Sequence, residues 1–284
     1  MTFTQQDARP ELESAPGSEW WRTAVIYQIY PRSFADASGD GLGDLPGVTA
    51  HLDDLKELGV DAIWLSPFQR SPQKDAGYDV ADYRDVDPIF GTLADFDAML
   101  AGAHDRGIRV IVDLVPNHSS DQHVWFQEAL KAAPGSPERG RYIFRDGKGE
   151  NGELPPNNWE SVFGGGMWKR VTEADGTPGQ WYLHIFDESQ PDFDWTNPEV
   201  RAEFESILRF WLDRGVDGFR VDVAHGLLKE AGLRDQVVRE GEKLGSGVDF
   251  SFEHAMVDHT GRDEPMWDQP EVHDGYRRWH RVLA

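Results

Sequence analysis

The sequence has no cysteine among its 284 residues, no long apolar run, and far fewer basic than acidic residues. Without cysteine, the chain can form neither a disulfide framework nor a thiolate metal site. No stretch of about 18 apolar residues is available to span a membrane, and segment 1–13 lacks the basic and apolar regions of a signal peptide. We therefore expect a soluble, cytoplasmic protein with no membrane partner.

The charge balance is strongly acidic, because 51 Asp and Glu stand against 28 Lys and Arg and give a formal net charge of -23. Such a surface repels a phosphate backbone, so we expect no nucleic-acid partner. The 39% of apolar residues is enough to bury a core. Eleven Trp and seven Tyr suit the flat faces of sugars, although we expect ordinary core packing for most of them.

Four short segments rich in β-branched and aromatic residues predict the strands of a buried parallel sheet. Helical spacing of apolar residues follows the first, second and third of these segments, and a further short helix is predicted near the end of the chain. Strands that alternate with helices indicate parallel βα units. The predicted strands are 24–30, 61–65, 109–115 and 217–222, and the predicted helices are 48–58, 93–106, 198–211 and 272–283.

Residues 119–195 are rich in Gly, Pro, Asn and aromatic residues and show no long periodic segment, which predicts a large insertion after the third strand. A closed (β/α)8 barrel needs eight strands, so four strands correspond to its first half. We expect the chain to stop before strand five. The predicted parts are a tail at 1–19, barrel strands one to three at 20–118, the insertion at 119–195, and the third helix and fourth strand within 196–284.

Polar residues stand where successive predicted strands end. Asp113 is followed by Asn117-His118, Arg220 precedes Asp222, and Asp79 lies in the loop after strand two. An aspartate at a strand end is more often a turn or cap residue. Their recurrence after successive strands favours a common site instead, because the carboxyl ends of barrel strands meet at one mouth.

These segments also form recognisable motifs. They are Asp-Leu-Val-Pro-Asn-His at 113–118, Gly-Phe-Arg-Val-Asp at 218–222, segment 24–34, Gly77-Tyr-Asp79 with Asp82-Tyr83, and Gln190-Pro-Asp192. In these motifs, in order from about Trp20 to Asp222, the sequence resembles the α-amylase superfamily, glycoside hydrolase family 13, and within it the α-glucosidase and oligo-1,6-glucosidase branch. The resemblance implies an α/β fold, the N-terminal half of a (β/α)8 TIM barrel with a domain-B-type insertion after strand three.

The resemblance implies a role for each matching residue. Asp222 would be the nucleophile that forms a covalent glycosyl ester, and Arg220 would keep its carboxylate ionised and oriented. Asp79 and His118 would hold hydroxyl groups of a terminal glucose. Three insertion residues would line the same pocket, although the two phenylalanines, taken alone, are more typical of core positions. These are Phe163, Phe186 and Gln190.

The general acid of the family is a Glu at the end of the fifth strand, and a His-Asp pair after the seventh helps to bind the substrate. We find neither segment in the sequence. Three glutamates after the fourth strand, Glu253, Glu264 and Glu271, have no strand before them, so we assign none of them this role. We therefore expect the 284-residue chain alone to be inactive, with a C-terminal half as a possible partner in the full-length protein.

The segment 36–44 is a candidate calcium site. Oxygen donors at its first, third and fifth positions, a glycine at the sixth and a carbonyl at the seventh follow the logic of an EF-hand loop. A solvated acidic turn is the alternative, and the family's calcium loop at this place favours the site. The expected role is structural, and no organic cofactor is expected. The ligands would be Asp36, Ser38, Asp40, the Leu42 carbonyl and Asp44.

The function hypothesis is thus a retaining α-glucosidase that acts on small α-1,4- or α-1,6-linked glucosides. Val223 after the nucleophile resembles the α-1,6 pattern without deciding the linkage. A transglycosylating relative, of the sucrose isomerase or trehalose-forming type, is one alternative. Another is a non-catalytic protein, either a transporter heavy-chain ectodomain, which the intact Gly218–Asp222 motif disfavours, or a sugar-binding or interaction fragment.

Overall fold

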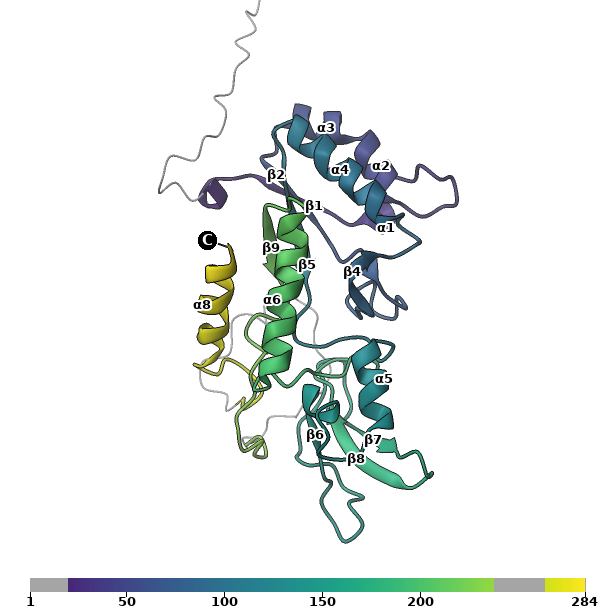
Figure 1. Ribbon diagram of the computed structural model, residues 1–284, viewed down its shortest axis with the longest axis vertical. Helices are drawn as coiled ribbons and strands as arrows, with labels where there is room; N and C mark the ends of the chain where they lie inside the picture. The colour runs from purple at the N-terminus through teal and green to yellow at the C-terminus, as the bar shows by residue number, and fades with distance from the viewer. Residues whose placement is uncertain (1–19, 238–263, 284) are drawn as a thin grey trace, which may run out of the picture. The chain divides into compact units, whose positions relative to one another are not determined.

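The computed structural model describes residues 20–237 and 264–283, so the predicted tail and Glu253 lie outside the described residues (Figure 1). The chain forms two compact units. One comprises the described residues up to Ser66 with Pro88–Asp113 and Arg214–Arg220. The other comprises Pro67–Asp87, Leu114–Asp213 and the described residues from Val221 onward. No helix within the described ranges is long and apolar enough to cross a membrane.

The four predicted strands form one sheet. They are β1 (Ile26–Ile29), β2 (Ala62–Leu65), β5 (Arg109–Leu114) and β9 (Gly218–Val221), in the order β1-β2-β5-β9. Both β1 with β2 and β2 with β5 pair in parallel, as the βα alternation predicted. The first strand was expected to be buried, but Ile26 and Tyr27 are 42% and 37% exposed. They are exposed because β1 lies at an edge of this sheet.

Short helices accompany the sheet in the first unit: η1 (Trp20–Arg22), α1 (Pro31–Phe34), α2 (Leu45–Ala50), α3 (Leu52–Leu58) and α4 (Leu93–Asp105). α4 begins with a capping box between Thr92 and Asp95. The prediction of a single helix over 48–58 is wrong. The chain breaks into α2 and α3 at His51, whose amide bonds to the Val48 carbonyl three residues back and so tightens the turn.

The second unit contains two small antiparallel sheets. One is the hairpin of β3 (Gln69–Arg70) and β4 (Asp82–Val86), in a region predicted to be only a loop. The other has β6 (Phe144–Arg145), β7 (Trp168–Thr172) and β8 (Pro178–Leu183) in the order β6-β8-β7. α5 (Val124–Lys131) and η2 (Arg139–Arg141) precede this sheet. Residues 119–195 therefore hold more regular structure than the sequence indicated.

A core of large side chains supports the second sheet. Asn157 accepts hydrogen bonds from the Trp159 amide (3.1 Å) and the Trp168 indole (2.7 Å), so the polar groups of these buried tryptophans have partners. Phe186 packs against this core. The buried members of the core are Ile143, Trp159, Met167, Trp168, Leu183, Ile185 and Met266.

Two helices of the second unit were predicted and are confirmed, α6 (Pro198–Asp213) and α8 (Val272–Leu283). The Asn197 side chain caps α6 by accepting the Glu199 amide at 2.8 Å, and Pro198 occupies the first helical position. The two helices pack together (Figure 1). Arg278 forms a 2.7 Å ion pair with Glu205 between them.

Candidate active site

An ion pair joins neighbouring strands of the first unit. Asp113 is 1% exposed, and both of its carboxylate oxygens lie 3.2 Å from Arg220 Nη1. Trp64 donates its indole N–H to the same carboxylate at 3.1 Å, and the Arg220 guanidinium lies 5.0 Å from the Trp64 ring centroid. This buried carboxylate therefore has a charged partner and a hydrogen bond. The predicted action of Arg220 on Asp222 stays a prediction.

Asp79 organises the loop that contains it. Its carboxylate is 0% exposed and accepts hydrogen bonds from Ser71 Oγ (2.8 Å), the Lys74 amide (3.0 Å) and the Asp75 amide (3.1 Å). Gly77 has a φ of 100°, and a Cβ there would come within 2.8 Å of a backbone oxygen, so only glycine fits this turn. A contact of Asp79 with sugar hydroxyls stays a prediction.

His118 is brought together with the predicted insertion residues. It is 2% exposed, and its Nε2 lies 3.2 Å from both the Tyr78 carbonyl oxygen and Gln190 Nε2. The Phe186 ring centroid is 5.2 Å from that of His118, and the Phe163 ring is 5.6 Å from that of Phe186. Phe163 is 46% exposed, so it lies at the outer end of this row. Their role as pocket lining stays a prediction.

Asp75 joins this cluster although the sequence reasoning did not identify it. Its Oδ2 accepts a 2.9 Å hydrogen bond from Gln190 Nε2. Burial raises the pKa of Asp75, and the charges of Asp79 and Asp222 add to this rise. Burial lowers the pKa of His118, although Asp222 and Asp75 oppose the shift. The Asp222 carboxylate therefore lies close enough to act on both groups.

The backbone around Asp222 is held at one side and strained at the other. Its amide donates to the Leu114 carbonyl at 2.8 Å. Val223 has a φ of 48°, which is unusual for a β-branched residue, and its carbonyl accepts the Gly226 amide at 2.9 Å. Strained residues of this kind often accompany functional sites. The turn therefore directs the chain sharply away from the predicted nucleophile.

Lys229 is a second residue that the sequence reasoning missed. Its side chain is 2% exposed and forms a 2.9 Å ion pair with Asp192, which is completely buried. The ammonium also donates to Asn117 Oδ1 at 2.8 Å and to the Gly226 carbonyl. No local pattern distinguishes Lys229 from a surface lysine in the sequence, since its partners are distant along the chain.

The loop at Asp36–Asp44 directs its carboxylates at its own backbone. Asp36 accepts the amides of Gly39 (2.7 Å) and Gly41 (2.8 Å), and Asp40 accepts that of Leu42 (2.8 Å). Asp44 accepts the Gly47 amide at 2.6 Å and so caps α2. The carboxylate and carbonyl oxygens of this loop are ligands of the type that calcium prefers. In the described ranges, however, no three acidic or histidine side chains gather as a metal site.

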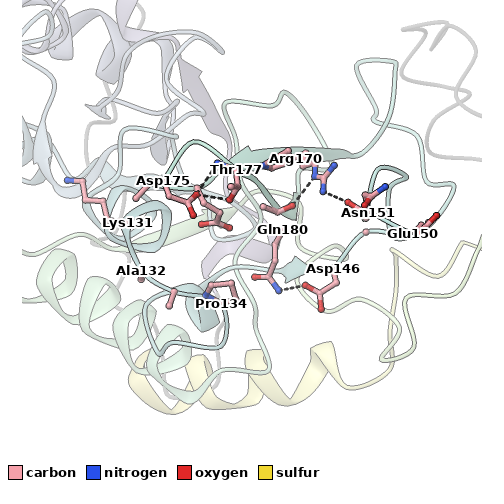
Figure 2. A pocket seen from close by; sticks show the side chains of 18 residues that line it. Lys131, Ala132, Pro134, Asp146, Glu150, Asn151, Arg170, Asp175, Thr177 and Gln180 are labelled. Carbon is pink, nitrogen blue, oxygen red and sulfur yellow. Dashed lines mark hydrogen bonds between the residues drawn. The ribbon is translucent and has the colours of Figure 1, made fainter.

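One hollow lies in the second unit, beside strands β7 and β8 (Figure 2), and its volume is about 790 Å³. Polar side chains line it. Gln180 donates to Asp146 at 2.8 Å, and Arg170 donates to the Asn151 carbonyl at 2.7 Å. None of the sequence-predicted site residues lines this hollow, so it does not belong to the candidate active site.

Comparisons with known proteins bear on this group of residues. An oligo-1,6-glucosidase of Parageobacillus thermoglucosidasius is 53% identical over 228 residues, which are 80% of this chain and 39% of that protein. The crystal structure of a Bacillus licheniformis trehalose-6-phosphate hydrolase matches with a TM-score of 0.79 at 41% identity, covering 93% of this chain and 42% of the other. That of an α-glucosyl transfer enzyme matches with a TM-score of 0.82 at 45% identity, covering 93% and 48%.

The chain thus spans less than half the length of each of these relatives. The matched part is N-terminal, and the match confirms the predicted fold class, the N-terminal part of a TIM barrel. The predicted domain boundaries stay predictions. The family model for the α-amylase catalytic domain matches residues 28–284, and the chain therefore belongs to the α-amylase family.

Proposed function

We propose that the whole protein is a retaining α-glucosidase, which removes terminal α-1,4- or α-1,6-linked glucose from short oligosaccharides. The observation that carries the proposal is the group of His118, Gln190 and Asp75 in one unit, within electrostatic reach of Asp222. The similarity to an oligo-1,6-glucosidase supports the same reaction.

In the proposed reaction, the Asp222 carboxylate attacks the anomeric carbon and forms a glycosyl ester while the glycosidic bond breaks. A second carboxyl group gives its proton to the leaving oxygen, then takes a proton from the water that hydrolyses the ester. Asp79 and His118 would hold sugar hydroxyls, and Arg220 would keep Asp222 ionised. We assign no residue of this sequence as the second carboxyl group, and so propose that the 284-residue chain alone is inactive.

A chimera tests the proposal. The segment of the Parageobacillus oligo-1,6-glucosidase that aligns with this chain is replaced by the chain itself, and hydrolysis of p-nitrophenyl α-glucoside is measured. We expect activity in the chimera, and a loss of roughly four to six orders of magnitude in kcat with Asp222→Asn, as for other lost nucleophiles. The exposed Asp82→Asn is the matched control and is expected to stay active.

Two results would count against the proposal. A chimera with native circular dichroism and cooperative unfolding but no hydrolysis would remove support for the predicted site. Hydrolysis that survives Asp222→Asn would show that another group is the nucleophile.

Glycosyl transfer is a second candidate, favoured by the structural match to an α-glucosyl transfer enzyme. In that case a sugar hydroxyl, in place of water, accepts the glucosyl group from the Asp222 ester. Chromatography of the chimera's products at high maltose concentration separates the two reactions, because transfer yields trisaccharides and hydrolysis yields only glucose.

We also propose that the Asp36–Asp44 loop binds calcium in a structural role. Its carboxylate, hydroxyl and carbonyl oxygens are the ligand types that calcium prefers, and Gly39 and Gly41 give the loop its tight turns with φ of 80° and 93°. A reducing compartment such as the cytoplasm suits a sequence without cysteine, and we propose it as the location.

A further inference from the structure

A buried series of hydrogen bonds links the Lys229 ammonium to the ring of His118. Lys229 Nζ lies 2.8 Å from Asn117 Oδ1 and 2.9 Å from the Asp192 carboxylate. Asn117 is completely buried, and its Nδ2 lies 3.1 Å from His118 Nδ1. The ammonium therefore reaches the imidazole through one amide group.

The orientation of that amide follows from the chemistry of its neighbour. An ammonium group has three donors and no acceptor, so the Asn117 atom that faces Lys229 must be the carbonyl oxygen. The amide NH2 group must then face His118 Nδ1. This holds independently of how the two similar amide ends are assigned in coordinates, because the reversed amide would set N–H groups against the ammonium.

The protonation of the His118 ring follows in turn. Burial lowers the pKa of His118, which favours the neutral ring with a single N–H. Nδ1 faces a donor and must offer its lone pair, so the proton belongs on Nε2. The Tyr78 carbonyl oxygen, 3.2 Å from Nε2, is placed to accept it. The other tautomer would turn an N–H toward the Asn117 amide and leave this carbonyl without that donor.

Gln190 does not reverse this assignment. Its Oε1 accepts the Asp187 amide at 3.1 Å and its Nε2 donates to Asp75 at 2.9 Å, so both ends are fixed. Its 3.2 Å approach to His118 Nε2 then brings two donors together and is not a hydrogen bond. Asn117 and Tyr78, by contrast, are both satisfied by one tautomer.

We propose that Lys229 is a positioning residue that fixes His118 as the Nε2–H tautomer through Asn117. When a sugar binds, the oxygen of one of its hydroxyl groups would take over the Nε2–H that the Tyr78 carbonyl accepts in the free protein. This last step rests on the proposed glucosidase function, whereas the tautomer itself does not. A lysine with only a structural role would leave the position of the ring proton unchanged when it is removed.

The test is long-range proton–nitrogen NMR of the full chain with nitrogen-15 in its histidines, with His118→Gln used to assign the ring. In the parent protein we expect an unprotonated Nδ1 and a protonated Nε2. Asn117→Asp is nearly isosteric but places an oxygen opposite Nδ1, so we expect Nδ1 to become protonated. Lys229→Met combined with Asp192→Asn removes both buried charges together, and we expect loss of the single tautomer.

An internal control accompanies these variants. His123 is an internal reference, since its Nδ1 accepts the Trp125 amide at 3.1 Å and should stay unprotonated in every variant. A parent protein with protonated Nδ1 on His118 overturns the proposal. So does an unchanged ring in Asn117→Asp or in the double variant.

A titration with methyl α-glucoside separates this proposal from the proposed function. Binding should shift the His118 Nε2 resonance in the parent protein. The predicted tautomer without any response to the sugar would count against the sugar site and leave the positioning role of Lys229 intact.

Discussion

Two loops, one in each unit, use aspartates in the same way but in different surroundings. In the Asp36–Asp44 loop, the exposed Asp36 accepts two backbone amides and the Ser38 hydroxyl. In the Ser71–Asp79 loop, the completely buried Asp79 also accepts two amides and a hydroxyl. Water can replace the partners of the exposed Asp36 more readily than those of the buried Asp79. The same hydrogen bonds should therefore contribute unequally to stability.

The largest effect is expected for Asp79→Ala. The substitution leaves Ser71 Oγ and the amides of Lys74 and Asp75 without the buried carboxylate that accepts their hydrogen bonds, and we expect a loss of about 3 kcal/mol in the free energy of unfolding. Urea denaturation measures it. Asp82→Ala is the matched control, because Asp82 is exposed and accepts the amide of Arg84 in place of a set of three donors. Equal losses in the free energy of unfolding for Asp79→Ala and Asp82→Ala would contradict the expected effect of burial.

Asp44→Ala comes next. Asp44 is 6% exposed and caps α2 through the Gly47 amide, and its oxygens also accept the amides of Ala37 (3.3 Å) and Ser38 (3.0 Å). Loss of the cap should lower the free energy of unfolding by about 2 kcal/mol. Asp44→Asn retains a capping oxygen and should recover most of it. A variant with Ala that unfolds at the parent urea midpoint would contradict this account of the loop.

The fold was predicted where the local pattern carries the information. All four strands and the helices α4, α6 and α8 follow from apolar periodicity and caps. The break at His51 was missed because apolar spacing continues through it. The β6-β8-β7 sheet was missed because β6 has only two residues and pairs with the distant β8, and because polar residues interrupt the β7–β8 hairpin. Burial of β1 was overestimated, since strand composition does not tell an edge from a centre.

The candidate site was predicted where a residue lies in a motif. His118 and Gln190 were named from the sequence, and the structure brings them together. Lys229 and Asp75 were missed because their partners Asn117, Asp192 and Gln190 lie far from them along the chain. Only the folded chain shows that Lys229 is buried and Asp75 half-buried among polar partners.

Calcium should act on one of the two loops only. At a tenfold excess over its dissociation constant, a ligand of the folded state adds about 1.4 kcal/mol to stability, so the melting temperature of the parent should rise with calcium and fall back with a chelator. Asp40→Asn should weaken the response, and Asp75→Asn, in the other loop, should not. Magnesium at equal ionic strength controls for screening. If the melting temperature of the parent does not change with calcium, the proposed calcium site is wrong.

The smallest effect is a pH dependence of opposite sign in the two loops. The amides of Gly41 and Gly39 hold the pKa of Asp36 below its usual value, so its contribution to stability is present above that value and is lost as the pH falls through the lowered pKa. Burial raises the pKa of Asp75, so its contribution is present below the usual value and is lost as the pH rises through the raised pKa.

Two variants make this difference measurable as urea midpoints between about pH 3 and 7. Relative to the parent, Asp75→Asn should gain stability as the pH rises, because the parent then bears the cost of a buried charge. As the pH rises through the acidic part of the same range, Asp36→Asn should lose stability relative to the parent, because the parent then gains the contribution of the ionised carboxylate. Slopes of the same sign would mean that burial does not distinguish the two carboxylates.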